Sequence, residues 1–239
     1  MWMALGARQH RRAVRRGGGG GTHDENGSVA SVRGRLITLE GIDGAGKSTL
    51  AVALRAHLAR ERPVELLREP GGVALSERIR ELVKDPGLRC DPRAEALLYA
   101  AARAQLVDER LRPWLDAGTW VLLDRFVDSS LAYQGAGRGL GVEAIAELND
   151  FATGSITPDM TLLLRIDPLA ARARQRSRLV APDRLEQEEH EFFDTIAAAY
   201  DELAAADPRR FRVLDADDTP ENVFMLAKIA LADLNSERR

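Results

Sequence analysis

The amino-acid sequence predicts an α/β domain in which helices cover both faces of a five-stranded parallel sheet. The first observation is that five short apolar runs alternate with stretches of helical periodicity between residues 36 and 235. The second is that the first apolar run enters a glycine-rich turn that leads directly into a helical pattern. Because parallel strands need long crossover connections, strands that alternate with helices favour a parallel sheet.

The expected elements follow one another from the first apolar run to the C-terminus. Apolar runs that end in polar or turn residues predict strands, and helical periodicity after an N-cap or a proline predicts helices. Residues 125–141, which are rich in Ser and Gly, are expected to form a loop. The expected strands are 36–40, 63–68, 119–124, 160–167 and 211–214, and the expected helices are 50–58, 76–82, 93–115, 142–151, one that begins at Pro168, 188–206 and 220–235.

The glycine-rich turn has the pattern Gly41-x-x-x-x-Gly46-Lys47-Ser48 between its strand and its helix. Its backbone N–H groups can surround phosphate oxygens, and the N-terminus of the following helix adds a positive dipole end. Lys47 can neutralise β- and γ-phosphates, and the Ser48 hydroxyl is a ligand for Mg²⁺. A plain glycine turn is the alternative. The context indicates a three-layer P-loop NTPase fold with this ATP-binding set: Gly41, Ile42, Asp43, Gly44, Ala45, Gly46, Lys47, Ser48 and Thr49.

Composition restricts the class of protein. The single Cys90 excludes an internal disulfide framework and favours a reducing compartment, so a cytoplasmic location is expected. No apolar run approaches about 18 residues, so no membrane span is expected. The net charge of −3 combines +5 in residues 1–35 with −8 in residues 36–239. A uniformly basic nucleic-acid-binding domain is therefore not indicated, and nucleic acid is not an expected partner.

Residues 1–34 are expected to be a disordered tail, rich in Arg and Gly, ahead of a single domain formed by residues 35–239. The tail contains few residues that could form a core. A basic arm or a transit-like peptide is the functional alternative, and a start codon placed too far upstream is another.

Carboxylates stand at the predicted carboxyl ends of four strands, where ligands of parallel sheets bind, so several are expected to converge. Asp124 is placed to hold Mg²⁺ together with Ser48, directly or through water. Arg125, beside it, offers a planar fork for phosphate. The alternative for Asp124 and Arg125 is a surface ion pair. The four strand-end carboxylates are Glu40, Glu69, Asp124 and Asp167.

Further positive charge is needed near the loop, because residues 42–45 contain no base and phosphoryl transfer depends on positioning and cations. A mobile lid over about residues 174–187 would supply it and exclude water. A solvated arginine face is the alternative. The arginines of this region are Arg172, Arg174, Arg176, Arg178 and Arg184.

Tyr99 and Arg103 are four residues apart, so they share one face of the helix expected at residues 93–115. An aromatic ring beside a guanidinium can stack on a base and bind its edge. Packing at the edge of the core is the alternative for this pair.

Five segments together resemble the bacterial thymidylate kinases. They occur in the family's order, and the resemblance covers about residues 35–235. It implies a nucleoside monophosphate kinase domain over residues 35–239 that transfers the γ-phosphate of ATP to dTMP, giving dTDP for dTTP biosynthesis. It also implies Mg²⁺ and a homodimer. The segments are Gly-Ile-Asp-Gly-Ala-Gly-Lys-Ser-Thr (41–49), Arg-Glu-Pro-Gly-Gly-Val (68–73), Asp-Arg-Phe-Val-Asp-Ser-Ser (124–130), Ala-Tyr-Gln-Gly (132–135) and Asp-Arg-Leu-Glu-Gln (183–187).

The resemblance also implies individual roles. Asp43 would bind the sugar 3′-hydroxyl near the dTMP phosphate, and Arg125 would bridge the donor and acceptor phosphates. Tyr99 would stack on thymine, and Arg103 would bond its O4 edge. The implied dTMP-binding set is Glu69, Arg80, Tyr99, Arg103, Arg125, Ser130, Tyr133 and Gln134; Ser130 and Gln134 would read the pyrimidine, Tyr133 would crowd the 2′ position, and Glu69 and Arg80 would line the site. The catalytic set is Lys47, Asp43, Arg125, Asp124 and Arg184, and the metal ligands are Ser48 and Asp124.

Gly44 matches the family class that takes its extra cation from the lid, where Arg184 is the leading candidate. Two features depart from the family. Phe126 stands where a Tyr is usual, and the tail has no counterpart in the typical protein. Another P-loop kinase of small molecules, a nucleotide-dependent switch or motor, and nucleic-acid binding through the tail are the competing functions.

Overall fold

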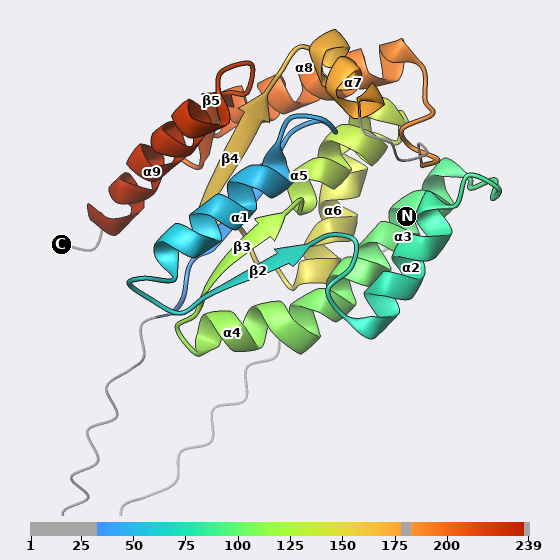
Figure 1. Cartoon of the computed structure of the whole chain (residues 1–239). Helices are drawn as coiled ribbons and strands as arrows, with labels where there is room; N and C mark the ends of the chain where they lie inside the picture. Colours follow the sequence, from blue (N-terminus) through green and yellow to red (C-terminus); the bar gives the residue numbers. More distant parts are fainter. Residues whose placement is uncertain (1–32, 178–182, 237–239) are drawn as a thin grey trace, which may run out of the picture. The chain divides into compact units, whose positions relative to one another are not determined.

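A computed structural model describes residues 33–177 and 183–236, so the predicted tail lies outside the described residues except for its last two. Within that part of the chain all strand pairings are parallel, and the strand order is β2-β3-β1-β4-β5 (Figure 1). The predicted parallel five-stranded sheet is confirmed. The strands are β1 Leu36–Glu40, β2 Val64–Arg68, β3 Trp120–Asp124, β4 Met160–Arg165 and β5 Phe211–Asp215.

The predicted helices are present, with additions. A π-helical turn separates α3 from α4, where Pro113 lacks the N–H that a regular helix needs. No helix among the described residues is long and apolar enough to cross a membrane. The helical elements are α1 Lys47–Leu58, α2 Ala74–Lys84, α3 Pro92–Leu106, η1 Val107–Leu111, α4 Arg112–Asp116, α5 Val127–Ser130, η2 Leu131–Gly137, α6 Val142–Thr153, α7 Pro168–Arg176, α8 His190–Ala206 and α9 Pro220–Ser236.

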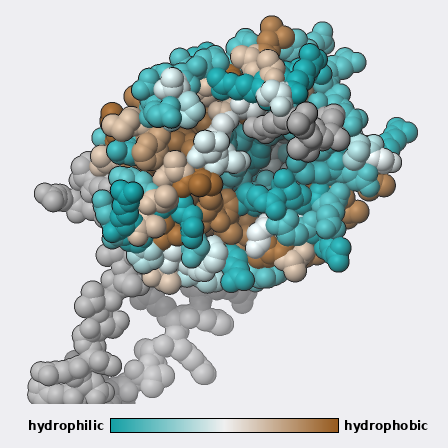
Figure 2. Space-filling model, in the orientation of Figure 1, coloured by the Kyte–Doolittle hydropathy of each residue, from teal (hydrophilic) through white to brown (hydrophobic). Residues whose placement is uncertain are grey.

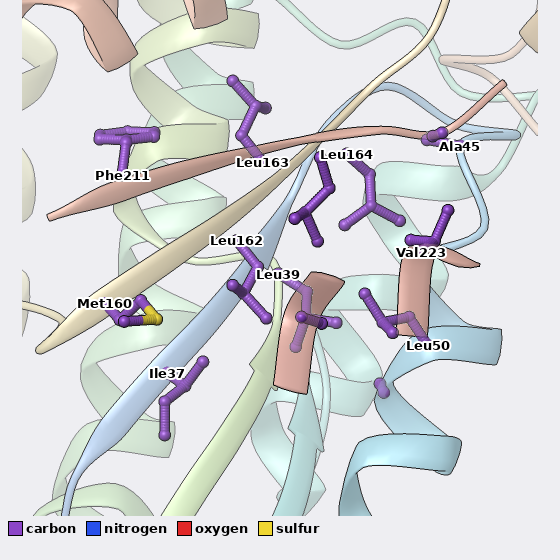
Figure 3. Packing of buried hydrophobic residues seen from close by; sticks show 14 of the residues in the cluster. Ile37, Leu39, Ala45, Leu50, Met160, Leu162, Leu163, Leu164, Phe211 and Val223 are labelled. Carbon is purple, nitrogen blue, oxygen red and sulfur yellow. The ribbon is translucent and has the colours of Figure 1, made fainter. Parts of the chain in front are cut away.

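Strand β1 is buried throughout because helices cover both faces of the sheet. Ile37 and Leu39 pack in one cluster with Leu50 of α1, as Figure 3 shows from close by. Leu36 packs in another cluster with Leu106, the last residue of α3. Since neighbouring residues of a strand point to opposite faces, α1 and α3 lie on opposite sides of the sheet (Figure 1).

The surface reflects this layering. Hydrophobic residues gather over α1 and α9, and the outer faces of α2 and α3 are mainly hydrophilic (Figure 2). The hydrophobic residues that these helices leave exposed include Val52 on α1 and Met225, Leu226 and Ile229 on α9.

The expected loop at residues 125–141 is wrong, because α5 and η2 occupy most of it. Ser and Gly indicate tight packing here instead of a loop. A Cβ at Gly135 would lie 3.1 Å from the Cα of Val142, and one at Gly137 would lie 2.8 Å from the ring of Phe192. The glycines therefore let η2 pack closely against α6 and α8.

The register of the sheet sets up the site. Asp124, at the end of β3, aligns with Leu39 of β1 on one side and with Arg68 of β2 on the other. The glycine-rich turn and the turn after β2 consequently begin at the same edge of the sheet.

Candidate active site

A cavity of about 240 Å³ lies at this edge, between the glycine-rich turn, α2, α3 and η2. All eight residues that the resemblance assigns to dTMP line it, although they come from positions spread between 69 and 134 of the chain. Four of the five expected catalytic residues, Asp43, Lys47, Asp124 and Arg125, line it as well. The structure therefore gathers most of the predicted site around one space.

The glycine-rich turn needs its glycines for conformation and for space. Gly41, Gly44 and Gly46 have φ angles of 131°, 93° and 94°, a region that residues with a Cβ rarely adopt. A Cβ on Gly44 would also lie 2.4 Å from the carbonyl oxygen of Ala171 on α7. The turn is thus held close to the helix that precedes the expected lid.

Lys47 is the first residue of α1 and is nearly fully buried beneath the turn. Its Nζ donates hydrogen bonds of 2.9 Å to the carbonyl oxygens of Gly41 and Ile42. Burial, with the nearby guanidinium of Arg125, lowers the pKa of Lys47 to about 8. An anion bound at the turn would therefore raise the pKa of Lys47.

Ser48 and Asp124 meet at the mouth of the turn. Ser48 Oγ donates a 2.8 Å hydrogen bond to Oδ2 of Asp124. The other carboxylate oxygen, Oδ1, is buried and has no hydrogen-bond partner within the described part of the chain. An unsatisfied buried carboxylate oxygen is costly unless a cation or a water binds it. This pair of hard oxygen donors therefore fits Mg²⁺.

Arg125 follows β3 with φ at 71°, the left-handed region that favours glycine. Its NH2 nitrogen donates to Oδ1 of Asp43 at 2.7 Å and to the hydroxyl of Tyr133 at 3.1 Å. Burial by itself would raise the pKa of Asp43. The positive charges of Arg125 and Lys47 outweigh burial and hold that pKa well below its usual range.

A buried cluster of hydroxyls and a carboxylate lies behind Arg125. Arg125 NH1 donates to Ser129 Oγ at 3.0 Å, and Ser129 Oγ donates to Oε2 of Glu40 at 2.6 Å. The Tyr200 hydroxyl donates to the same oxygen at 2.9 Å, and the backbone N–H of Phe126 donates to Oε1 at 2.8 Å. Burial raises the pKa of Glu40. Glu40 therefore helps to hold Arg125 in position through Ser129.

The expected convergence of strand-end carboxylates is partly correct. Glu69 and Asp124 line the cavity, whereas Glu40 belongs to the buried cluster. Asp167 caps α7 instead, since its Oδ1 accepts from the backbone N–H groups of Leu169 and Ala170. It lines a separate cavity of about 580 Å³ that also includes Gly41 and Ile42.

Arg103 forms the rigid floor of the cavity, with 1% of its surface exposed. It donates to Glu69 Oε2 at 2.7 Å, to Ser130 Oγ at 2.8 Å, to the Phe126 carbonyl oxygen at 2.9 Å and to the Asn149 side chain. Burial, opposed by the charge of Arg103, raises the pKa of Glu69 to about 7. Tyr99, one turn earlier on α3, lines the same cavity. The hydrogen bonds to protein groups thus fix the orientation of the Arg103 guanidinium.

Glu95 of α3 connects this floor to the end of the lid region. Its two oxygens, both fully buried, accept from Gln134 at 2.8 Å, from Arg138 at 3.2 Å and from Arg184 at 2.5 Å. Arg184 also donates to the Val83 carbonyl oxygen at 2.9 Å. Arg184 is not among the described residues that line the cavity, although Asp183, Leu185 and Glu186 are.

The predicted lid lies only partly within the described residues, because 178–182 fall outside them. Its first part is the end of α7, where Arg174 donates to the Ala216 carbonyl oxygen at 2.8 Å. A third cavity, of about 630 Å³, opens there against the glycine-rich turn. Its lining combines Gly44, Ala45, Gly46 and Thr49 of the expected turn and Arg174 and Ser177 of the expected lid with residues that were not expected, among them Leu164, Ala216, Pro220, Val223 and Phe224.

Several residues of the site gave no signal in the sequence. Glu95, Asn149 and Tyr200 sit within ordinary helical patterns, and Ser129 was not distinguished from the neighbouring serine. Their roles become clear only from their hydrogen bonds to residues that are distant in the chain.

The chain is similar to known proteins in both sequence and structure. A family model described as thymidylate kinase matches residues 39–226. The chain is 46% identical over 206 residues to a thymidylate kinase of Halorhodospira halophila, covering 84% of this chain and 95% of that protein. It is 49% identical over 185 residues to one of Deinococcus radiodurans, covering 77% and 89%. The crystal structure of thymidylate kinase from Ehrlichia chaffeensis superposes with a TM-score of 0.68 at 30% identity, covering 83% and 99%.

Proposed function

Because this chain belongs to the thymidylate kinase family and phosphorylates dTMP to dTDP with ATP, we propose that the two nucleotides meet across Arg125. The observation that carries this assignment is the single cavity, which combines the phosphate-binding turn with the whole expected acceptor set. Phosphoryl transfer needs little covalent chemistry from the protein. The residues therefore act by positioning the phosphates and by offsetting their charge.

The donor site consists of the glycine-rich turn and the cavity of about 630 Å³ beside it. The triphosphate would lie on the backbone N–H groups of residues 41–49, with Lys47 at its β- and γ-phosphates. Its nucleoside would enter the cavity of about 630 Å³, whose lining by Leu164, Val223 and Phe224 suits an apolar ring face. Arg174, at the rim, offers a planar guanidinium for stacking.

The acceptor site consists of α3, η2 and the turn after β2. Tyr99 supplies a ring on which thymine stacks, and Arg103 presents its rigid edge to the O4 side of the base. Ser130 and Gln134 read the remaining polar edge of the pyrimidine. Tyr133, whose hydroxyl lies 3.4 Å from Asp43, would crowd a ribose 2′-hydroxyl, while Asp43 binds the 3′-hydroxyl. Glu69 and Arg80 complete the wall.

Transfer itself relies on cations from two directions. Lys47 approaches from the donor side and Arg125 bridges the two phosphates, with Asp43 and Ser129 fixing the orientation of the Arg125 guanidinium. Arg184 remains the proposed cation of the lid. Its bonds to Glu95 and Val83 mean that it must leave this position to reach the transferred phosphate.

We propose that Mg²⁺ binds at Ser48 and Asp124, directly or through water. The unsatisfied Oδ1 of Asp124 supports this assignment. When bound, Mg²⁺ supplies charge neutralisation at the phosphates. The chain's own part is to present two oxygens in a fixed geometry, since the hydrogen bond from Ser48 holds the Asp124 carboxylate.

A homodimer and a cytoplasmic location are also proposed. Phe151 on α6 is 89% exposed and Leu97 on α3 is 58% exposed, and these helices pack against each other. Exposed large hydrophobic side chains on adjacent helices support an interface between copies. We further propose that residues 35–239 act as one domain, which the grouping of 31–239 into one compact unit supports.

An acceptor panel tests the function. Purified protein is given ATP and Mg²⁺ with dTMP, AMP or thymidine, and the phosphorylated form of each acceptor is measured. We expect dTMP to be phosphorylated far faster than AMP, and thymidine to remain unchanged. In the same assay Lys47→Ala should lower kcat about 100- to 1000-fold, because it removes charge at the transferred phosphate. Equal turnover of dTMP and AMP would contradict the proposed acceptor site.

A further inference from the structure

Lys84 is a cation of the acceptor wall that neither the motifs nor the expected site include. It ends α2, one helical turn after Arg80, and both residues line the cavity of about 240 Å³. Since residues four apart share a helix face, α2 presents two cations toward the same space. The chain has two other lysines, Lys47 in the glycine-rich turn and Lys228 on α9.

Two other cations that line the cavity are held by protein groups. Arg103 donates to four side chains or carbonyl oxygens, and Arg68 donates to both carboxylate oxygens of Glu77 on the surface. Arg80 donates to the Pro70 carbonyl oxygen at 2.9 Å. Lys84 has donors to spare as well, because within the described residues its Nζ has one hydrogen-bond partner, the Asp183 carboxylate. An ammonium group has three donors.

Lys84 lines the same cavity as Asp43 and Arg125, the residues expected near the acceptor phosphate. The positive charge of Lys84 contributes to the low pKa of Asp43, together with those of Arg125 and Lys47. Its side chain is 34% exposed, so it is partly desolvated without being locked in the core. The neighbouring lid arginine, Arg184, is turned away to Glu95.

From these contacts we propose that Lys84 binds the 5′-phosphate of the acceptor nucleotide, with Asp183 as its counter-ion while the phosphate is absent. This proposal rests on the proposed function, because it extends the acceptor site. The phosphate replaces the Asp183 carboxylate as the anionic partner of the ammonium, and Asp183 keeps the hydrogen bonds that its Oδ1 accepts from the backbone N–H groups of Leu185 and Glu186. Asp183 is one of the described residues of the region where the lid is expected.

Equilibrium binding without ATP tests the proposal. Calorimetry would measure dTMP and thymidine binding to the full chain and to Lys84→Met, Lys84→Arg and Asp183→Asn. Lys84→Met should weaken dTMP binding about 10- to 100-fold and leave thymidine binding unchanged, because only dTMP carries the phosphate. Lys84→Arg should restore most of the loss. Asp183→Asn should tighten dTMP binding, since it removes the competing anion.

Lys228→Met is the matched control, because Lys228 contacts Met225 and Phe224 on α9 and does not line this cavity. Equal weakening of dTMP and thymidine by Lys84→Met would overturn the proposal and make Lys84 a support of the wall. If Asp183→Asn weakened dTMP binding as much as Lys84→Met does, the proposal would also be overturned. The ion pair between Lys84 and Asp183, and not a contact of Lys84 with the phosphate, would then determine the affinity for dTMP. If the unchanged protein did not phosphorylate dTMP, the proposed function itself would fail, which is a separate result.

Discussion

The hydroxyl of Tyr200 donates a 2.9 Å hydrogen bond to Oε2 of Glu40, although the two residues are 160 positions apart. Ser129 lies between them, within 2.9 Å of the Tyr200 hydroxyl, and accepts from Arg125. The last long helix before β5 is thereby connected to the Arg125 guanidinium, which we propose bridges the phosphates. Tyr200 acts as a positioning residue in this arrangement, since it reaches the reaction only through Arg125.

Tyr200→Phe should therefore lower kcat about tenfold while changing the KM for dTMP little. The reason is that it removes one hydrogen bond from Glu40, worth about 0.5–1.5 kcal/mol, and loosens Ser129. Steady-state kinetics with varied dTMP would separate the two parameters. Asp201→Asn is the control, because Asp201 neighbours Tyr200 but pairs with Arg165 on the surface. A parallel rise in KM would assign Tyr200 to substrate binding instead.

ATP binding should take up protons near pH 8. Lys47 has a pKa of about 8, so its amine is neutral in roughly half of the free protein molecules at that pH. The triphosphate raises this pKa, and the complex therefore binds more protons than the free protein. Calorimetry in two buffers of different ionisation enthalpy would measure the uptake. Lys47→Arg should abolish it, because arginine stays charged, and proton release at pH 8 would contradict the assignment.

Asp124→Asn should raise the Mg²⁺ concentration needed for half-maximal turnover about 10- to 100-fold. The substitution keeps the hydrogen bond that Ser48 can donate but removes the charge beside the unsatisfied oxygen. Turnover at fixed ATP with varied Mg²⁺ would measure the shift. Asp150→Asn, on the exposed side of α6, is the matched control. An unchanged Mg²⁺ requirement would remove Asp124 from the metal site.

Arg103→Ala should lower the free energy of unfolding by about 3–5 kcal/mol at pH 8, because it leaves Glu69 charged and buried without a partner. The loss should be smaller at pH 6. Glu69 has a raised pKa of about 7 even with Arg103 present, so without the guanidinium it binds a proton more readily and avoids the buried charge. Urea unfolding at both pH values would show the difference. A loss that grows as the pH falls would be inconsistent with this account.

Local features of the site could be predicted from the sequence, and distant ones could not. The glycine-rich turn is encoded within eight residues, and the Tyr99–Arg103 pair depends only on helical spacing. Glu95 was invisible because its partners Gln134 and Arg184 are 39 and 89 positions away. Its sequence context is that of any exposed helical glutamate, yet the side chain is fully buried.

Composition also misled in one place. The Ser and Gly residues of 125–141 predicted a loop, because both are common in turns. In the structure these small residues let η2 approach α6 and α8, and Ser129 and Ser130 are buried among hydrogen bonds to Glu40 and Arg103. Whether a helix packs closely against another depends on both helices, and a local sequence pattern describes only one of them.

The left-handed backbone at Arg125 has a consequence for directed evolution. A residue with a side chain in that region costs about 1–3 kcal/mol, and glycine would relieve the strain. Arg125→Gly would relieve this strain but remove the ion pair with Asp43 and the hydrogen bonds to Ser129 and Tyr133, so a library screened for heat tolerance alone should not enrich it. At this position the fold accepts an unfavourable backbone conformation, and the contacts of the Arg125 side chain offset its cost.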